Sequence, residues 1–371
     1  MKKELSVKSA SGELVVEPAP HVTGSMTKNR LMQYTFVALL ILVGVSFFSF
    51  GVTSLITSAI AVLVAVALDA AIGLGMKRRG PINTMSAAVF GLIVALSYSL
   101  GVPSMAQPTD VLPKEALAAP QAYLYVAIIS ALGMIVFKKG QGLLGRKYVN
   151  PAATAKLVVL LPFVATLFLA AAHFASFTQG GLGVPLLAGP IGNTVINNNG
   201  AAPFVSYLQS CFANPAVAVL PDVYWLMIVQ KFHGWTGGAS SLAVIIVGTG
   251  LFIVARNYNI KWRITLSYLV TVPLMALLMA TIYGGDALLR VVFELFIGSS
   301  IFLAFFMATD PATTPLTFTG QAIFGVGLGV LTVLIQTFMN FFGGSILALI
   351  IMNLTVPLLD CVGIHKPFGR R

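Results

Sequence analysis

Ten apolar stretches run through this chain, each close to the length that a helix needs to cross a lipid bilayer. A spanning helix takes about 20 mostly apolar residues. The stretches cover about residues 32–50, 52–76, 85–102, 121–137, 151–173, 239–255, 264–283, 291–307, 321–339 and 344–360. With 57% hydrophobic and 9% charged residues, the chain has more apolar surface than a water-soluble core can bury. We therefore predict an all-α polytopic membrane protein with ten transmembrane helices.

The basic residues gather in alternate segments between these stretches. Most of the 22 Lys and Arg residues fall in residues 1–31, 77–79, 138–147, 256–263 and 366–371. Cytoplasmic loops of membrane proteins carry an excess of Lys and Arg, so this pattern places both termini in the cytoplasm. The net charge of +11 then reflects membrane topology, and we expect no nucleic-acid partner. The polar N-terminal residues lack the apolar core of a secretory signal, which also predicts a cytoplasmic tail.

The stretches divide into two groups of five. Because five is odd, equivalent helices of the two groups run in opposite directions, as in an inverted repeat. Inverted repeats often place a site at their interface, near broken helices. We predict two inverted five-helix halves, 32–173 and 239–360, joined by an extracytoplasmic segment, 174–238, and flanked by tails at 1–31 and 361–371.

The sequence carries few groups for chemistry of its own. Cys211 and Cys361 are far apart with no CxxC pair, and the four histidines show no metal-ligand spacing. These patterns do not support an iron–sulfur cluster, a zinc site or a c-type haem on this chain. The sequence also lacks a nucleophile triad or an acid–base pair, so we expect no independent catalytic activity.

A glycine-rich loop leads into the fifth stretch. In KKGQGLLGRKYVNPAATAK, residues 138–156, Asn150 is a candidate N-cap and Pro151 a candidate first helical residue. A helix N-terminus at such a turn suits an anion, although a tight turn with basic anchors explains the pattern equally well. Lys156 falls in the second turn of an apolar helix. It either extends back to the membrane interface or pairs with a ligand phosphate or a carboxylate.

Two acidic residues stand alone inside apolar stretches. An ionisable residue within a span is a candidate functional residue. Asp69 nevertheless lies within two turns of Lys77, and Glu294 lies one turn from Arg290, so simple charge pairing explains both positions as well. Ion coupling through either carboxylate therefore stays open.

Residues 308–320 break an apolar helix with threonines, prolines and one aspartate, and contain no Lys or Arg. Thr309, Asp310 and Thr313 offer hydroxyls and a carboxylate, while Pro311 and Pro315 prevent the helix from continuing. Non-helical backbone at membrane depth needs cover by protein or water. We expect this edge to face a cavity, a cofactor or a partner subunit; the alternative is a plain turn between two helices.

These residues carry a resemblance to a known family. Ala308-Thr309-Asp310-Pro311 closes a Phe-rich helix, Gly320 follows, and GVGLG lies in the ninth stretch. Together with KKGQGLLGRKYVNPA and KRRGPINTMSAAV, they resemble the NqrB/RnfD family. Its members are a membrane component of the Rnf electron-transport complex, RnfD, and its relative in the sodium-pumping NADH:quinone reductase, NqrB. The similarity covers nearly the whole chain and the same ten-helix plan, and the short N-terminal tail favours the Rnf type.

The resemblance implies a flavoprotein subunit in the plasma (inner) membrane. Such a subunit relays electrons, with ferredoxin as donor, within a complex that exports sodium ions or protons. Its partners would be the other membrane, flavin and iron–sulfur subunits of the complex. The sequence does not choose between sodium and proton, and does not identify the final electron acceptor.

The family usually carries FMN on a threonine in the extracytoplasmic segment, and this chain departs from that pattern. The matching stretch is Asn199-Gly200-Ala201-Ala202-Pro203-Phe204, with Ala202 at the acceptor position. A methyl group cannot form the phosphoester. The upstream Thr194 does not match in its neighbours. We therefore expect FMN or riboflavin to bind without a covalent bond, or the outer flavin to be lost.

Two places remain candidates for a flavin. The outer one combines the Asn run 197–199 and Phe204 with the loop Gly234–Ser241, where Trp235 supplies a flat ring and Thr236 and Ser240 supply hydroxyls. An ordinary loop explains these residue types equally well. The second candidate is the Thr/Asp segment 308–320, together with Asn150 and Lys156.

Two other classes of protein remain alternatives. An inverted-repeat secondary transporter or channel for a small polar solute would have the same topology, because fold alone does not settle function. A structural scaffold of the complex is the weaker alternative. A transporter would purify alone and colourless, whereas an Rnf subunit would purify with its partners and show a flavin spectrum.

Overall fold

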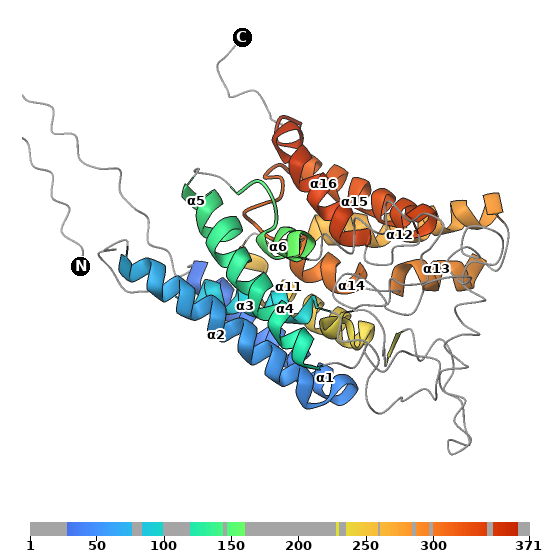
Figure 1. Ribbon diagram of the computed structural model, residues 1–371. Helices are drawn as coiled ribbons and strands as arrows, with labels where there is room; N and C mark the ends of the chain where they lie inside the picture. Colours follow the sequence, from blue (N-terminus) through green and yellow to red (C-terminus); the bar gives the residue numbers. More distant parts are fainter. Residues whose placement is uncertain are drawn as a thin grey trace, which may run out of the picture.

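The computed structural model describes residues 28–75, 84–98, 119–143, 147–159, 228–229, 235–258, 260–283, 287–296, 300–339 and 344–362. The regular structure of the described part consists of helices and contains no strand (Figure 1). The predicted tails, most of the connecting segment and the candidate residues Asn199, Ala202 and Phe204 lie outside the described residues.

In the first half, the long helices are α1 (Lys28–Phe50), α2 (Val52–Gly75) and α4 (Ala119–Leu132). Helix α4 continues as a π-helix, η3 (Gly133–Gly140), and then as the short α5 (Gln141–Leu143). The shorter helices are α3 (Met85–Leu96) and α6 (Pro151–Val159).

The connecting segment ends in a 3₁₀ turn, η5 (Thr236–Gly238), and the second half begins with α11 (Ser241–Val254) and the turn η6 (Arg256–Tyr258). Then come α12 (Trp262–Tyr283), α13 (Ala287–Phe296), α14 (Ser300–Phe302) and a second π-helix, η7 (Leu303–Met307). Helices α15 (Phe318–Met339) and α16 (Gly344–Leu359) complete the described chain.

Each predicted apolar stretch contains a helix, and the chain is a multi-pass membrane protein. Among the described residues, five helices are long and apolar enough to cross a membrane by themselves: α1, α2, α4 with η3, α12 and α15. Helix α13 and the α14–η7 helix form a sixth span if the bent pair, at 58°, is counted as one. Helices α3, α11 and α16 are apolar but shorter. The count of ten and the inverted relation of the halves stay predictions.

Glycines bring α3 close to α2 in the first half and α15 close to α12 in the second half. A Cβ atom on Gly91 of α3 would lie 2.7 Å from the Ala61 carbonyl oxygen of α2, and one on Gly325 of α15 would lie 2.5 Å from the Ile264 carbonyl oxygen of α12. Small residues let helix backbones approach each other in lipid. The GVGLG sequence is therefore a packing motif of α15, which meets α12 at Gly325 and Gly329 and α16 at Gly327.

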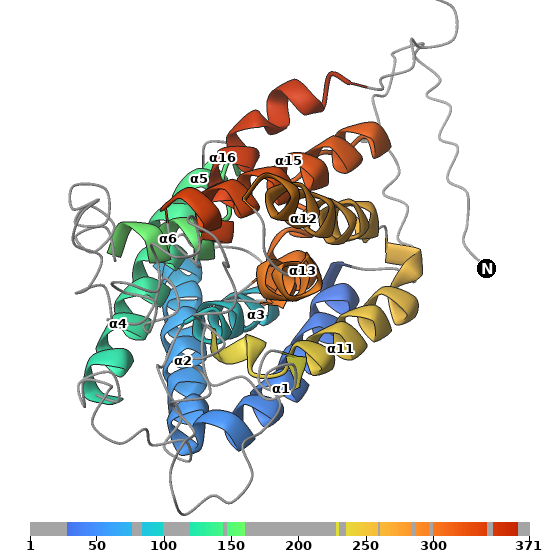
Figure 2. The same ribbon diagram turned by 90° about the vertical axis from the view of Figure 1, so that its right-hand side faces the viewer.

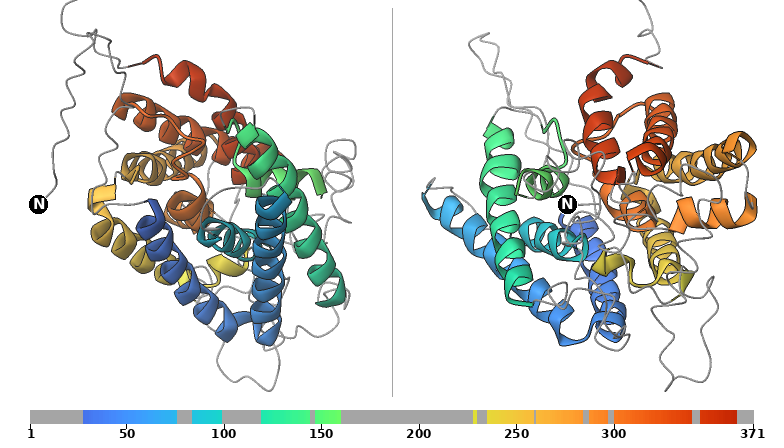
Figure 3. Two further views of the ribbon diagram at one scale, coloured as in Figure 1. Left: turned by 90° about the vertical axis from the view of Figure 1, so that its left-hand side faces the viewer. Right: turned by 45° about the vertical axis from the view of Figure 1, so that its right-hand side comes forward.

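The two halves meet along several contacts. Helix α11 lies along α1, and α6 contacts α16 (Figures 2 and 3). Between them, η5, α14 and η7 lie near the centre of the bundle, where Trp235, Phe302 and Phe306 are buried. The ends of helices from both halves consequently surround one common region.

Candidate cofactor pocket

Asn150 lies at the centre of the contact between the two halves. Its side-chain Oδ1 accepts hydrogen bonds from the backbone N–H groups of Ala152 and Ala153, both at 3.1 Å, so the predicted N-cap of α6 is confirmed. Its side-chain amide donates to the Met307 carbonyl at the end of η7, at 3.3 Å. Its backbone N–H donates to Asn353 Oδ1 of α16, at 2.9 Å. One residue thus fixes α6 to two elements of the second half.

The segment after η7 is folded as a tight turn around Asp310. The Asp310 carboxylate accepts from the Ala312 N–H and from the Thr313 hydroxyl, both at 3.2 Å. The Thr309 hydroxyl donates back to the Phe305 carbonyl at 2.7 Å. A turn between two helices, which was the alternative prediction for residues 308–320, is therefore present. It places residues 309–311 at the wall of a cavity.

Lys261 supplies the positive charge that this segment lacks in its own sequence. The buried Lys261 ammonium donates to the Thr314 carbonyl at 2.7 Å, to the Thr314 hydroxyl at 2.8 Å and to the Pro311 carbonyl at 3.2 Å. Asn353 adds a bond from its side-chain amide to the Thr313 carbonyl at 3.0 Å. The backbone carbonyls of this non-helical segment thus accept hydrogen bonds from Asn353 of α16 and from Lys261 in the loop before α12.

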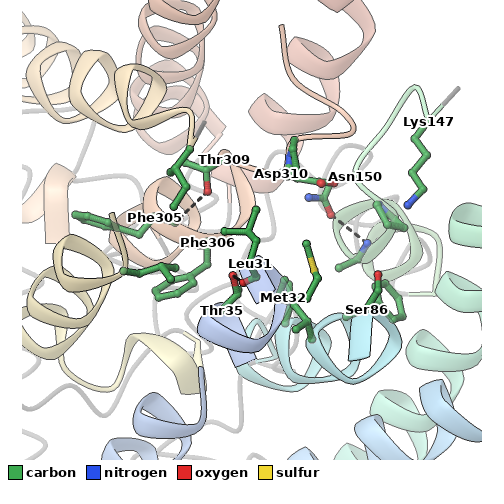
Figure 4. Close-up of a pocket in the computed structure, with 18 of the residues that line it drawn as sticks. Leu31, Met32, Thr35, Ser86, Lys147, Asn150, Phe305, Phe306, Thr309 and Asp310 are labelled. Carbon is green, nitrogen blue, oxygen red and sulfur yellow. Dashed lines mark hydrogen bonds between the residues drawn. The ribbon is translucent and has the colours of Figure 1, made fainter. Parts of the chain in front are cut away.

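A pocket opens between these elements (Figure 4). It contains about 840 Å³ of atom-free space, including its open mouth. Its walls come from both halves and are mainly apolar and aromatic. They comprise Leu31, Met32, Thr35, Ser86, Val89, Phe90, Ile93, Lys138, Lys147, Asn150, Pro151, Ala152, Leu251, Phe252, Ile260, Phe305, Phe306, Thr309, Asp310 and Pro311. In the predicted topology, all the helix ends at this pocket lie on one side of the membrane.

Polar and charged groups are few in the pocket and lie at defined places. The Lys138 ammonium donates to the Ser86 carbonyl and lies 5.1 Å from the centroid of the Phe90 ring. Lys147 and Asp310 also line the pocket, and the Thr35 hydroxyl donates to the Leu31 carbonyl at 2.9 Å. An apolar cleft with a small number of placed polar groups is typical of a binding site for an organic cofactor.

Comparison with known proteins gives the family. The model of the NQR2, RnfD, RnfE family matches residues 15–108 and 115–369, which is nearly the whole chain. The chain belongs to this family.

Relatives in the NQR2, RnfD, RnfE family match over almost their full length. The chain is 27% identical over 362 residues to the D component of the Na⁺-translocating ferredoxin:NAD⁺ oxidoreductase complex of Acetobacterium woodii, covering 96% of this chain and 95% of the relative. It is 26% identical over 361 residues to the D component of the proton-translocating ferredoxin:NAD⁺ oxidoreductase complex of Clostridium ljungdahlii, covering 96% of each. It is 25% identical to the D component of an ion-translocating oxidoreductase complex of Shewanella amazonensis, covering 96% of this chain and 98% of the relative.

The candidate residues for a flavin divide into two groups in this member of the NQR2, RnfD, RnfE family. Asn150, Thr309 and Asp310 line the pocket, and Thr313 supports it through Asp310 and Asn353. Lys156, Trp235, Thr236 and Ser240 lie elsewhere. Their part in binding a flavin stays a prediction.

Lys156 is buried at 1% exposure instead of extending to the membrane interface. Its ammonium donates to the Ser97 carbonyl at the end of α3 and lies 4.2 Å from the centroid of the Trp235 ring. Thr236 donates from both its N–H, at 2.9 Å, and its hydroxyl, at 2.6 Å, to the Tyr98 carbonyl. This contact satisfies the carbonyls that α3 leaves free at its C-terminus. Ser240 caps α11 by accepting from the Ala243 N–H at 3.2 Å.

Asp69 forms an ion pair with Lys139 at the end of η3, whereas its position in the sequence suggested a pair with Lys77. Lys77 itself lies outside the described residues. The ion pair anchors α2 to η3 beside Lys138. This arrangement gives the carboxylate a structural role, and ion coupling through Asp69 stays untested.

Several residues of the pocket were missed by sequence reasoning. The Phe-rich end of the eighth stretch gave no site residue, yet Phe305 and Phe306 line the pocket together with Phe90. Ser86 lies in the KRRGPINTMSAAV motif, which served for the resemblance but gave no site residue. Lys138 was interpreted as an ordinary topology anchor. The signal that was available is the position of Ser86, Asn150 and Asp310 at the ends of apolar stretches that the predicted topology puts on one side of the membrane.

Proposed function

We propose that this chain is a membrane subunit of an Rnf-type ion-translocating oxidoreductase complex, in which it relays electrons that originate from ferredoxin. Membership in the NQR2, RnfD, RnfE family supports this function, as do relatives named as the D component of such complexes over almost the full chain. The chain acts with other membrane, flavin and iron–sulfur subunits and has no independent catalytic activity.

The relay within this subunit is a flavin held without a covalent bond in the pocket. The observation that carries this proposal is the pocket between the halves, with aromatic walls and polar groups at its rim. Phe90, Phe305 and Phe306 offer flat apolar surfaces to a ring system. Asn150, Thr309 and Lys138 offer polar atoms for the edges of a ring or for a ribityl chain. A bound flavin would supply one- and two-electron transfer, which no described side chain supplies.

The protein contributes binding and exclusion of water. Phe305 and Phe306 are buried and belong to η7, whose carbonyls are tied down by Asn150 and by the Thr309 hydroxyl. The aromatic wall is thereby fixed to both halves. Lys138 provides an amine beside the cleft that can donate a hydrogen bond to an anionic reduced ring or a phosphate.

Purified complex containing this chain tests the proposal directly. After acid precipitation, we expect flavin fluorescence in the supernatant, and we expect the band of this subunit on a denaturing gel to be dark under ultraviolet light. Absence of flavin from both fractions would contradict the proposal and favour a transporter or a scaffold. A flavin-phosphate mass increment on a Thr or Ser of residues 180–241 would instead overturn the interpretation of Ala202 as a lost attachment site.

We also propose the ten-helix topology with inverted halves and cytoplasmic termini in the plasma membrane. Its support is the helix found in each apolar stretch and the convergence at one pocket of helix ends that alternate in sequence. Single cysteines placed in residues 1–31 and 363–371 should react with a membrane-impermeant maleimide only after the cells are opened. Labelling of either terminus in intact cells would contradict this topology.

A further inference from the structure

Arg263, in the first turn of α12, lies between two aromatic rings. Its guanidinium carbon is 3.9 Å from the centroid of the Phe318 ring, at the start of α15, and 5.0 Å from the centroid of the Trp262 ring. A guanidinium within about 6 Å of a ring centroid is attracted by the ring quadrupole. Since α12 and α15 lie side by side (Figure 2), the cation is held between the first turns of both helices.

The hydrogen-bonding capacity of Arg263 is left unused by the protein. A guanidinium carries five N–H donors, and the two rings supply no oxygen acceptor for them. Among the residues that the structure describes, no carboxylate pairs with Arg263 and no carbonyl accepts from its side chain. Lys261, two residues earlier, is by contrast buried and donates to Pro311 and Thr314. Arg263 is half-exposed, so its donors can be reached from outside the helix bundle.

The acidic side chains near the start of α15 already accept hydrogen bonds from the protein. The Asp310 carboxylate accepts from the Ala312 N–H at 3.2 Å, and the Asp360 carboxylate accepts from the Leu316 N–H at 2.8 Å. The loop before α12 adds a second cation, Arg256, which is exposed. The charge of the described residues here therefore favours an anionic ligand.

An apolar stripe begins beside Arg263 and runs along α12. Its members recur every four residues, share one face of the helix and are 46–60% exposed: Trp262, Leu266, Val270 and Leu274. We call it the α12 stripe. It extends over twelve residues, which is about 18 Å of helix. One leaflet has about 15 Å of hydrocarbon, half of the roughly 30 Å of the bilayer, so the α12 stripe is long enough to cross a leaflet.

Helix α15 adds a second apolar face beside the α12 stripe. Phe318 and Val326 lie about two turns apart, share one face of α15 and are exposed. Between them, Gly325 brings α15 against α12, because a Cβ atom there would lie 2.7 Å from the Ser267 Cβ. An acyl chain can therefore contact both helices while its head group meets Arg263.

We propose that Arg263 binds the phosphate of an anionic phospholipid in the cytoplasmic leaflet, with an acyl chain along the α12 stripe and the adjoining face of α15. The planar fork of arginine matches a phosphate through two parallel hydrogen bonds. Trp262 lies at the same level, and tryptophan is enriched at the membrane interface. An acidic protein segment would match the charge but would not need an apolar surface as long as a leaflet. The site rests on the proposed topology for its leaflet, and not on flavin or electron transfer.

The test uses the intact complex in nanodiscs made of phosphatidylcholine and phosphatidylglycerol in equal shares. A photoreactive group is placed on the acyl chain of one lipid or of the other, and labelled peptides are identified by mass spectrometry. The measured quantity is the ratio of phosphatidylglycerol label to phosphatidylcholine label on residues 262–274 and 318–326. We expect this ratio to exceed the average ratio over the other labelled helices.

Three variants show whether Arg263 itself causes the excess. Arg263→Gln should lower the ratio about fivefold, the effect of one basic residue at an anionic surface. Arg263→Lys keeps the charge but loses the fork, so it should lose only part of the excess, and it serves if Arg263→Gln does not assemble. Arg256→Gln is the matched control, because it removes a cation from the same loop that makes no ring contact among the described residues. It should keep most of the excess.

Four results would overturn the proposal. An unchanged ratio in Arg263→Gln would show that this side chain does not select the lipid. Equal losses in Arg263→Gln and Arg256→Gln would show general attraction to a basic loop. Absence of label from either lipid on residues 262–274 would show that another subunit covers the α12 stripe. Loss of the excess in inorganic phosphate, but not in chloride at equal ionic strength, would show an anion site that does not recognise lipid.

Discussion

The backbone N–H of Asn150 donates to the side-chain Oδ1 of Asn353 at 2.9 Å, across 203 residues of sequence. The same asparagine of α16 donates its side-chain amide to the Thr313 carbonyl at 3.0 Å. Asn353 therefore connects the N-terminus of α6 to the segment after η7, and both elements line the pocket. The two halves are joined by a pair of amides at the wall of the proposed cofactor site.

Replacing Asn353 by Leu should destabilise this junction. The change leaves the Asn150 N–H and the Thr313 carbonyl unpaired in the interior, which costs about 1–3 kcal/mol for each group. We expect a lower melting temperature of the purified complex and faster loss of flavin on dilution. Thr355→Val is the matched control on α16, because Thr355 donates only to the Met352 carbonyl of its own helix. Equal melting temperatures and flavin retention for the two variants would contradict the junction.

Lys261 should hold the Asp310 segment in place. Hydrogen bonds to charged groups are worth about 1.5–3 kcal/mol, and Lys261→Met removes those to Pro311 and Thr314. We expect faster amide hydrogen exchange over residues 309–317. Arg256→Met removes an exposed cation from the same loop and should leave amide hydrogen exchange over residues 309–317 unchanged. If both variants exchange alike, the segment is held by its internal turn rather than by Lys261.

The contact between α12 and α15 should tolerate no side chain at Gly325. Its Cβ would lie 2.5 Å from the Ile264 carbonyl oxygen, which is backbone and cannot move aside cheaply. Gly325→Ala should cost about 1–3 kcal/mol by overpacking, seen as a lower melting temperature. Gly250→Ala on α11 is the matched control, since nothing lies within 4 Å of its Cβ position. At position 250 alanine favours the helix more than glycine does, so the melting temperature of Gly250→Ala should equal or exceed that of the parent protein.

The sequence predicted what depends on composition and on local pattern. Apolar length predicted a helix in each stretch, because lipid demands internally satisfied backbone. Asn-Pro predicted the N-cap at Asn150, because the cap is made by residues next to it. The bonds from Asn353 to Asn150 and from Lys261 to Thr314 join positions far apart, and nothing local distinguishes these polar residues from solvated ones.

Lys156 illustrates the same limit within one side chain. Its position predicted either extension to the interface or a ligand, while its actual neighbour is Trp235 of the connecting segment. The pocket could be approached from sequence through Asn150 and Asp310. Its aromatic walls could not, because Phe305 and Phe306 have the same sequence signature whether they face lipid, core or cofactor.

Removal of one aromatic wall provides the sharpest test of the pocket. Phe306 is 6% exposed, lines the cleft, and stacks on Phe302 with ring centroids 5.3 Å apart. Phe306→Ala removes a flat surface that would contact the flavin ring, and stacking of an aromatic pair contributes about 0.5–1.5 kcal/mol beyond area burial. We expect flavin recovered in the acid supernatant, per mole of complex, to fall by about tenfold, a difference of about 1.4 kcal/mol in binding.

Two controls separate binding from folding in this experiment. Phe48→Ala makes the same chemical change at a residue that is 75% exposed on α1 and remote from the pocket, so flavin content should be unchanged. Phe306→Leu keeps apolar volume in the core but loses the flat ring. It should therefore retain most of the thermal stability that Phe306→Ala loses, yet still release flavin more readily than the parent protein. Full flavin content in Phe306→Leu and Phe306→Ala, with both complexes assembled, would show that the cofactor lies elsewhere in the chain.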